Sequence, residues 1–317
     1  MNDNPLVSVC MITYNQEAYI AQAIEGVLLQ ETDFPIEFVI GEDCSTDRTL
    51  EICERYRKKY PDLIKVFPRP KNVGMQTNFR DTILQCKGKY VAFCEGDDYW
   101  TEAKKLQIQI EFLEANPDFV ICHHKLRISD GGNLTNDFIP SSNVKEISGF
   151  EDLAQKHQVH MASCVFRRGA LGKFPDWFTQ ILCTDYALFL LISQTGRVKF
   201  IDKVMGVYRV HSGGVWSGKK SREAILSSLE TLKLCQVHFA PRAFPEFSTH
   251  EASIHADLCF DEFENGCLTE FRRYYRSFII NYLGAANIRT ILALSSRFLV
   301  SLFPPSIQIY KRDNDRN

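Results

Sequence analysis

Residues 7–40 read VSVCMITYNQEAYIAQAIEGVLLQETDFPIEFVI. Val7–Thr13 and Ile36–Ile40, at the two ends of this stretch, are short apolar runs of the kind that form buried strands. Between them, Ala18–Gln30 carries its apolar residues at helical spacing. A strand, a helix and a second strand in this order predict two parallel strands joined by a right-handed crossover.

The same alternation continues up to residue 123. Further strands are predicted at Ile64–Phe67, Tyr90–Cys94 and Phe119–His123, and further helices at Thr46–Tyr60, Gln76–Cys86 and Thr101–Ala115. The pattern predicts an α/β fold in which a mostly parallel central sheet is flanked by helices. Sheets of this kind bind ligands at the carboxyl ends of their strands, so the loops that follow Thr13, Ile40 and Cys94 are the candidate site.

The second half of the chain is less regular. Ser129–Ser148 is rich in Gly, Asn, Ser and Pro and predicts a loop, whereas Met161–Phe166 and Val204–Val210 predict strands, and Tyr186–Ser193 predicts a helix. From Ser221 onward the pattern is mainly helical. We therefore expect an α/β domain over residues 1–220 and a helical C-terminal extension over residues 221–317.

The composition is that of an ordinary globular protein, with 317 residues, 45% hydrophobic residues and a net charge of −2. This charge gives no general reason to bind nucleic acid. The 11 cysteines are odd in number and include no Cys-x-x-Cys pair, and the first residues show no secretory signal pattern. Together these features predict a cytoplasmic protein.

Acidic residues follow two of the predicted strands. Glu42 and Asp43 follow the second strand, and Glu95, Asp97 and Asp98 follow the fourth. Carboxylates at the end of a buried strand are costly unless a cation or hydrogen bonds compensate them, and oxygen ligands suit Mg²⁺ or Mn²⁺. Read singly, each cluster is equally well explained as a helix cap or a solvated turn. Two clusters at the same edge of one sheet favour a binding site.

Two nucleotide-binding alternatives fit less well. Residues 213–220, GGVWSGKK, nearly match the phosphate-binding loop G-x-x-x-x-G-K-[ST], but Lys220 replaces the hydroxyl that should reach Mg²⁺. A dinucleotide-binding fold needs G-x-G-x-x-G after the first strand, where this chain has TYNQE.

Four motifs occur in a specific order: VCMITYN at residues 9–15, GEDCSTD at 41–47, KNVG at 71–74 and EGDDYW at 95–100. Over about residues 5–215 the chain resembles family 2 of the glycosyltransferases, which are inverting enzymes with the GT-A fold. The resemblance implies that the chain moves a sugar from a nucleotide-sugar donor, expected to be a UDP-sugar, to an acceptor hydroxyl in polysaccharide or O-antigen-type glycan synthesis.

The resemblance also assigns roles to the acidic residues and the first loop. Thr13, Tyr14 and Asn15 would line the donor pocket, and Asp43, with Glu42 beside it, would bind the base. The segment from Glu95 to Asp98 matches the family's metal-binding element, with Glu95, Asp97 and Asp98 holding Mn²⁺ or Mg²⁺ and Asp97 also binding the donor. Glu42 and Glu95 depart from the family pattern, which has Asp at both positions.

Asp185 opens an apolar helix within Cys183-Thr184-Asp185-Tyr186 and matches the family's catalytic carboxylate, which takes the proton from the acceptor hydroxyl. Its position alone is equally consistent with a charge at a helix N-terminus. Farther along, Arg209 is a candidate for donor binding and His211 for a further metal ligand. Ser163 and Trp100 are candidates for the acceptor side, although both are also compatible with ordinary core packing.

The expected partners are the nucleotide-sugar donor and a glycan or lipid-linked glycan acceptor. The apolar segment Ile288–Phe303, with Arg289 and Arg297 as its charges, predicts either peripheral contact with the inner face of the membrane or packing in a homo-oligomer or on the catalytic domain. Two other functions stay open at this point, a catalytically inactive nucleotide-sugar-binding scaffold and a nucleotidyltransferase on a related sheet.

Overall fold

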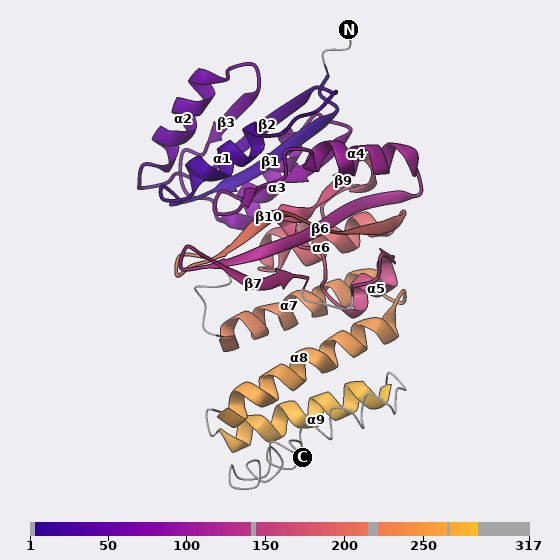
Figure 1. Cartoon of the computed structure of the whole chain (residues 1–317). Coiled ribbons are helices and arrows are strands. Elements are labelled where there is room, and N and C mark those ends of the chain that lie inside the picture. Colours follow the sequence, from indigo (N-terminus) through magenta and orange to yellow (C-terminus); the bar gives the residue numbers. More distant parts are fainter. Residues whose placement is uncertain (1–3, 141–143, 215–220, 265–266, 285–317) are drawn as a thin grey trace, which may run out of the picture. The chain divides into compact units, whose positions relative to one another are not determined.

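The computed structural model describes residues 4–140, 144–214, 221–264 and 267–284 (Figure 1). Its internal contacts divide the chain into two compact units, Met1–Ala243 and Phe244–Asn317. The first unit contains every candidate site residue. It extends beyond residue 220, and the domain boundary expected there stays a prediction.

The strands of the first unit belong to one sheet of mixed direction. They are β1 (Val7–Thr13), β2 (Ile36–Glu42), β3 (Ile64–Pro68), β4 (Tyr90–Phe93), β5 (Tyr99–Trp100), β6 (Phe119–Asp130), β7 (Asn133–Ile139), β8 (Ile147–Ser148), β9 (Val165–Arg167) and β10 (Arg197–Val210). They lie in the order β3-β2-β1-β4-β9-β6-β10-β5, with β7 beside β6 and β8 beside β10. The strands from β3 to β4 are parallel, as predicted, whereas β9 runs antiparallel to both of its neighbours.

Helices cover both faces of this sheet. They are α1 (Ile20–Leu28), α2 (Thr49–Lys59), α3 (Met75–Gln85), α4 (Lys105–Ala115), α5 (Phe150–Gln155), α6 (Thr184–Ser193) and α7 (Ser221–Phe239). One core cluster joins Val7, Val9 and Met11 of β1 to buried residues of α1, α2 and α4. Alternate residues of a strand point to opposite faces. On the other face, Phe93 of β4 accordingly stacks on Phe79 of α3, with ring centroids 5.3 Å apart.

The sequence predicted the elements of the N-terminal half well and two later segments badly. The expected loop at residues 129–148 instead contains the end of β6, all of β7 and β8. Gly131 and Gly132 join β6 to β7 with positive φ angles of 54° and 87°, which glycine adopts without strain. Residues 161–163, expected to be strand, form a short 3₁₀ helix before β9.

The second unit contains α8 (Phe244–Glu264) and α9 (Leu268–Gly284). Within the described ranges, none of the helices is both long enough and apolar enough to span a bilayer. The segment Ile288–Phe303, for which membrane contact was predicted, lies outside the described residues, as do residues 215–220 of the loop-like GGVWSGKK sequence.

Candidate functional site

A cavity of about 310 Å³ lies where the carboxyl ends of β1, β2 and β4 meet. Its walls come from several parts of the chain: the loops after β1 and β2, the loop into α3 with the start of that helix, the acidic turn after β4, residues 160–161, the start of α6, the end of β10 and residues 213–214. Thr13, Tyr14, Asp43, Glu95, Asp97, Asp185 and Arg209, all predicted from the sequence, line it. The topology therefore brings together residues that lie up to 196 positions apart, between Thr13 and Arg209.

The acidic turn, residues 95–98, packs closely against the end of β1. The Gly96 amide donates to the Ile12 carbonyl at 3.2 Å, and the Asp98 amide donates to the Glu95 carbonyl at 3.1 Å. A Cβ atom on Gly96 would lie 2.3 Å from Oε1 of Gln16 and 2.8 Å from Oγ1 of Thr13. A side chain at this position would have to displace Gln16 and Thr13, so glycine allows the turn to lie close to the end of β1.

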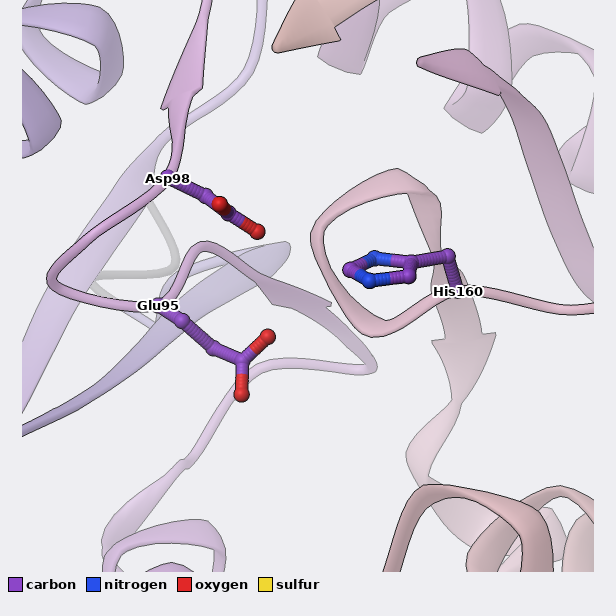
Figure 2. Close-up of side chains that lie close together, drawn as sticks. All are labelled: Glu95, Asp98 and His160. Atoms are coloured by element: carbon purple, nitrogen blue, oxygen red, sulfur yellow. The ribbon is translucent and has the colours of Figure 1, made fainter. Parts of the chain in front are cut away.

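Glu95, Asp98 and His160 form a group with the chemistry of a cation site (Figure 2). One potential ligand atom from each lies within 4.8 Å of the others, and the three side chains point toward one another. Oδ2 of Asp98 and Nδ1 of His160 are buried without a hydrogen-bond partner. Unpartnered buried polar atoms are costly, and a divalent cation bound between them would compensate that cost.

The pKa shifts of Glu95, Asp98 and His160 also favour a bound cation. Burial, with Asp97 and Asp185 nearby, raises the pKa of Glu95 to about 8. Burial and the neighbouring carboxylates raise the pKa of Asp98 well above its usual value. Burial also lowers the pKa of His160 to about 4, which keeps its ring neutral and able to ligate a metal. The residues present thus fit a bound Mn²⁺ or Mg²⁺.

The end of β10 holds the acidic turn from the other side. The Arg209 amide donates to Oδ1 of Asp98 at 2.9 Å, and its guanidinium donates to the Asp97 carbonyl and to Gln22. Nε2 of His211 lies 3.1 Å from Oδ2 of Asp97. The structure thus brings His211 to the acidic turn, and its role as a metal ligand stays a prediction.

At the end of β2, Asp43 is buried and fixes the loop into α3. Its two carboxylate oxygens accept the amides of Val73 and Gly74 at 2.8 and 3.0 Å. Glu42 is fully buried, accepts the Ser45 amide at 2.7 Å and does not line the cavity.

The loop after β1 meets the same turn. Asn15 has a positive φ of 52° and accepts the Thr46 amide through its side chain at 2.8 Å. Like Glu42, Asn15 therefore supports the loops around the cavity, whereas the half-exposed Tyr14 lines it.

Two residues expected on the acceptor side lie in the core instead. The ring nitrogen of Trp100 donates to the Ala162 carbonyl at 2.8 Å, and the hydroxyl of Ser163 donates to the His160 carbonyl at 2.7 Å. Both are buried and neither lines the cavity, so acceptor contact through these side chains has no support in the structure. Their hydrogen bonds instead fix residues 160–163 and hence the position of His160.

Asp185 lies in the first turn of α6 and faces the cavity. Its Oδ2 lies 3.2 Å from Nε2 of His157, and its Oδ1 accepts the Tyr186 amide at 2.8 Å. Burial alone would raise the pKa of Asp185, but His157, His160 and the Tyr186 amide outweigh it and lower the pKa. The carboxylate is therefore ionised at neutral pH, as a general base must be.

Sequence reasoning missed His157 and His160. Neither belongs to a recognisable motif, and each is separated from its partners by more than twenty positions. Their importance follows from the fold alone.

Residues 8–174 match the family model described as glycosyl transferase family 2. The chain belongs to this family. Its mixed sheet flanked by helices is the GT-A fold, which solved structures share. With TarS of Staphylococcus aureus in complex with UDP-GlcNAc, the TM-score is 0.60 at 21% identity, covering 79% of this chain and 72% of that one.

Other comparisons agree. The mannosyltransferase PcManGT of Pyrobaculum calidifontis, in complex with GDP-Man and Mn²⁺, has a TM-score of 0.57 at 17% identity, covering 95% of this chain and 82% of that one. The uncharacterised protein Rv1520 of Mycobacterium tuberculosis is 35% identical over 211 residues, which are 66% of this chain and 60% of that protein. The chain thus spans about three fifths of the length of this relative. The putative teichuronic acid biosynthesis glycosyltransferase TuaG of Bacillus subtilis is 27% identical, over 76% of this chain and 97% of TuaG.

Proposed function

We propose that this family 2 member transfers a sugar from a nucleotide-sugar donor to an acceptor hydroxyl in a single displacement with inversion. The observation that carries the proposal is one cavity lined both by an acidic turn suited to a cation and by an ionised carboxylate, Asp185. An inverting transfer needs these two groups together, one near the leaving diphosphate and one near the attacking hydroxyl.

The donor lies along the ends of β1 and β2, with its base near Tyr14 and Asp43. Glu95, Asp98 and His160 would hold the divalent cation, with Asp97 and His211 as further candidate ligands, and the Mn²⁺ in the PcManGT complex is a precedent. When bound, the cation neutralises the diphosphate. The guanidinium of Arg209, on the Asp97 carbonyl, adds positive charge at the same place.

In the reaction, Asp185 accepts the proton of the acceptor hydroxyl as the acceptor oxygen bonds to the anomeric carbon. The bond from that carbon to the donor phosphate breaks, and its electron pair leaves with the nucleoside diphosphate. The position of Asp185 within the cavity and its lowered pKa both support this role.

The donor is a nucleotide sugar, and a UDP-sugar is our first choice because TarS, with the same fold, was solved with UDP-GlcNAc. Similarity to TuaG supports an acceptor in surface polysaccharide synthesis, as a free or lipid-linked glycan. We propose that the transfer takes place in the cytoplasm, at the inner face of the membrane.

The proposal is tested by incubating the protein and Mn²⁺ with UDP-, GDP- and dTDP-sugars and measuring diphosphate release, with and without short glycans. We expect release from one donor, and a loss of at least about 100-fold in Asp185→Ala with donor affinity unchanged. An Asp185→Ala protein as fast as the wild type would refute the assigned base. Release of pyrophosphate from a sugar phosphate and a nucleoside triphosphate would favour a nucleotidyltransferase, and binding without turnover would favour an inactive scaffold.

A further inference from the structure

Both oxygens of the Asp185 carboxylate are held by neighbouring groups. Oδ1 accepts the Tyr186 amide, and Oδ2 lies 3.2 Å from Nε2 of His157. The same Nε2 lies 3.0 Å from the carbonyl oxygen of Val159. A carbonyl can only accept, so this nitrogen carries the proton and donates to both oxygens. The hydrogen bonds thus fix the tautomer of His157 and the rotation of the carboxylate together.

His157 approaches Asp185 from outside the donor cavity. Asp185 lines that cavity, whereas His157 lines a second one, of about 580 Å³, between β7 and residues 156–160. The His157 side chain is 38% exposed and that of Asp185 is 19% exposed. The imidazole therefore contacts the carboxylate without occupying space that donor or acceptor would use in the first cavity.

The imidazole is itself held in place. Its ring meets the edge of Tyr186, with centroids 5.6 Å apart, and the Tyr186 hydroxyl donates to the Ala154 carbonyl at 3.0 Å. Tyr186 thus holds both members of the pair: its amide donates to the Asp185 carboxylate, and its ring packs against the His157 imidazole. This arrangement links α6 to the segment that follows α5.

We infer that His157 is a positioning residue for the base of the transfer, which orients Asp185 toward the acceptor oxygen. The inference rests on the proposed function, in which Asp185 takes the acceptor proton. A carboxylate that rotates freely spends little time with a lone pair aimed at the hydroxyl, and a fixed one avoids that loss. His157 neither touches the donor nor takes the proton in this account.

The first test is kinetic and uses the full chain with Mn²⁺ and UDP-GlcNAc or GDP-Man, whichever the wild type hydrolyses. In His157→Ala we expect kcat for diphosphate release to fall roughly 10- to 100-fold, part of the 10²–10⁴ that a positioned base contributes. The affinity for the diphosphate should stay unchanged, because His157 does not line the donor cavity. His157→Gln, whose amide can donate to Asp185, should recover part of the rate.

Added imidazole should also partly restore His157→Ala, since the second cavity is large enough to admit it. His238→Ala is the matched control, because His238 is an exposed histidine on α7 that contacts Trp177 and lines neither cavity. A wild-type kcat in His157→Ala, or a loss confined to diphosphate affinity, would overturn the inference. Absence of diphosphate release by the wild type from every donor, both with and without short glycans, would instead count against the proposed function.

A second test needs no turnover. The pair predicts that His157 titrates above the usual histidine pKa, because Asp185 outweighs the burial that lowers it. Other charged or titratable groups near the pair are Glu95, Asp97 and His160. In Asp185→Asn, the pKa of His157, followed by NMR of its ring protons, should fall. An unchanged His157 pKa in Asp185→Asn would show that the two side chains do not interact, and would overturn the inference whatever the activity.

Discussion

At the scale of single residues, the site depends on carboxylates that the protein keeps close together. The pKa of Glu95 in the folded protein is raised to about 8. Below that pH the Glu95 carboxyl is protonated, and a cation that binds there must displace the proton. We therefore predict that Mn²⁺ affinity rises with pH between pH 6 and 8, by about tenfold per pH unit for each ligand proton that the cation displaces. Calorimetry across this range measures the slope.

The variant Glu95→Gln serves as the control for that slope. It removes the titrating group, so the affinity should be lower and depend less on pH. The same slope in Glu95→Gln and in the wild type would mean that Glu95 is not a ligand.

Gly96 is the second prediction at this scale. A Cβ there would lie 2.3 Å from Gln16 and 2.8 Å from Thr13, so Gly96→Ala has to displace these side chains or shift the acidic turn from β1. We expect at least about a tenfold loss of Mn²⁺ and diphosphate affinity, since small displacements of ligands cost much at such sites. Gly169→Ala, where a Cβ meets nothing within 4 Å, is the control and should bind normally. Equal binding by both variants would contradict the tight contact.

At the scale of elements, strand β6 contains two adjacent histidines, His123 and His124, that are both fully buried. His123 lies against Phe200, is fully buried, and has both ring nitrogens without a hydrogen-bond partner. Burial lowers its pKa to about 3, below the value near 6.5 of the unfolded chain. Between these values the unfolded state binds more protons, so stability falls as the pH drops below about 6.5, by up to about 1.4 kcal/mol per unit.

The variant His123→Leu tests whether buried His123 causes this loss of stability at low pH. It should be about as stable as the wild type at pH 7.5 and lose less stability between pH 6.5 and 4.5, as measured by urea unfolding. Some dependence should persist, because His124 is also buried with a lowered pKa. His238→Leu, at an exposed position, should leave the slope unchanged. An unchanged slope in His123→Leu would contradict the assignment of a neutral, buried ring.

Elements were predictable from the sequence where the strand is buried and reads as a continuous apolar run. Val7–Thr13 was predicted to its bounds because its apolar run has no polar competitor. β7 was missed because it is largely exposed and lacks apolar alternation, although Gly131-Gly132 is a typical hairpin turn.

Some residues of the candidate site could likewise be identified from the sequence, and others only from the structure. Glu95, Asp97 and Asp98 are contiguous and visible as a motif, and Asp185 was found by resemblance. His157 and His160 were not found, since only the path of the chain between α5 and β9 brings them to Asp185 and Asp98. The sequence could not show that Trp100 and Ser163 are buried, because the packing around each is set by segments distant in the chain; their acceptor role stays a prediction.

At the scale of the whole molecule, α7 is the element that decides where the catalytic unit ends. Leu229, Leu232, Cys235 and Phe239 of α7 are buried, and Phe239 meets the edge of Phe150 with centroids 5.1 Å apart. A protein ending at Ala243 should therefore unfold cooperatively and bind diphosphate as the full chain does. A protein ending at residue 220 should lose several kcal/mol, at about 1.5–3 kcal/mol for each large side chain that loses its packing.

Thermal unfolding of the two truncated proteins measures this difference. If the shorter one were as stable as the longer one, the unit would end near residue 220, as the sequence alone suggested. If both failed to fold, the second unit would be required for the stability of the first.

The central claim is that the cavity binds a nucleoside diphosphate through a cation held by the acidic turn. The most direct measurement is calorimetric titration of UDP, GDP and dTDP into the full chain, with and without Mn²⁺, repeated with Asp98→Asn. The account predicts that one diphosphate binds, that its binding requires Mn²⁺, and that Asp98→Asn abolishes the metal dependence. Binding that is equally tight without Mn²⁺, or no binding of any diphosphate by the folded protein, would contradict it.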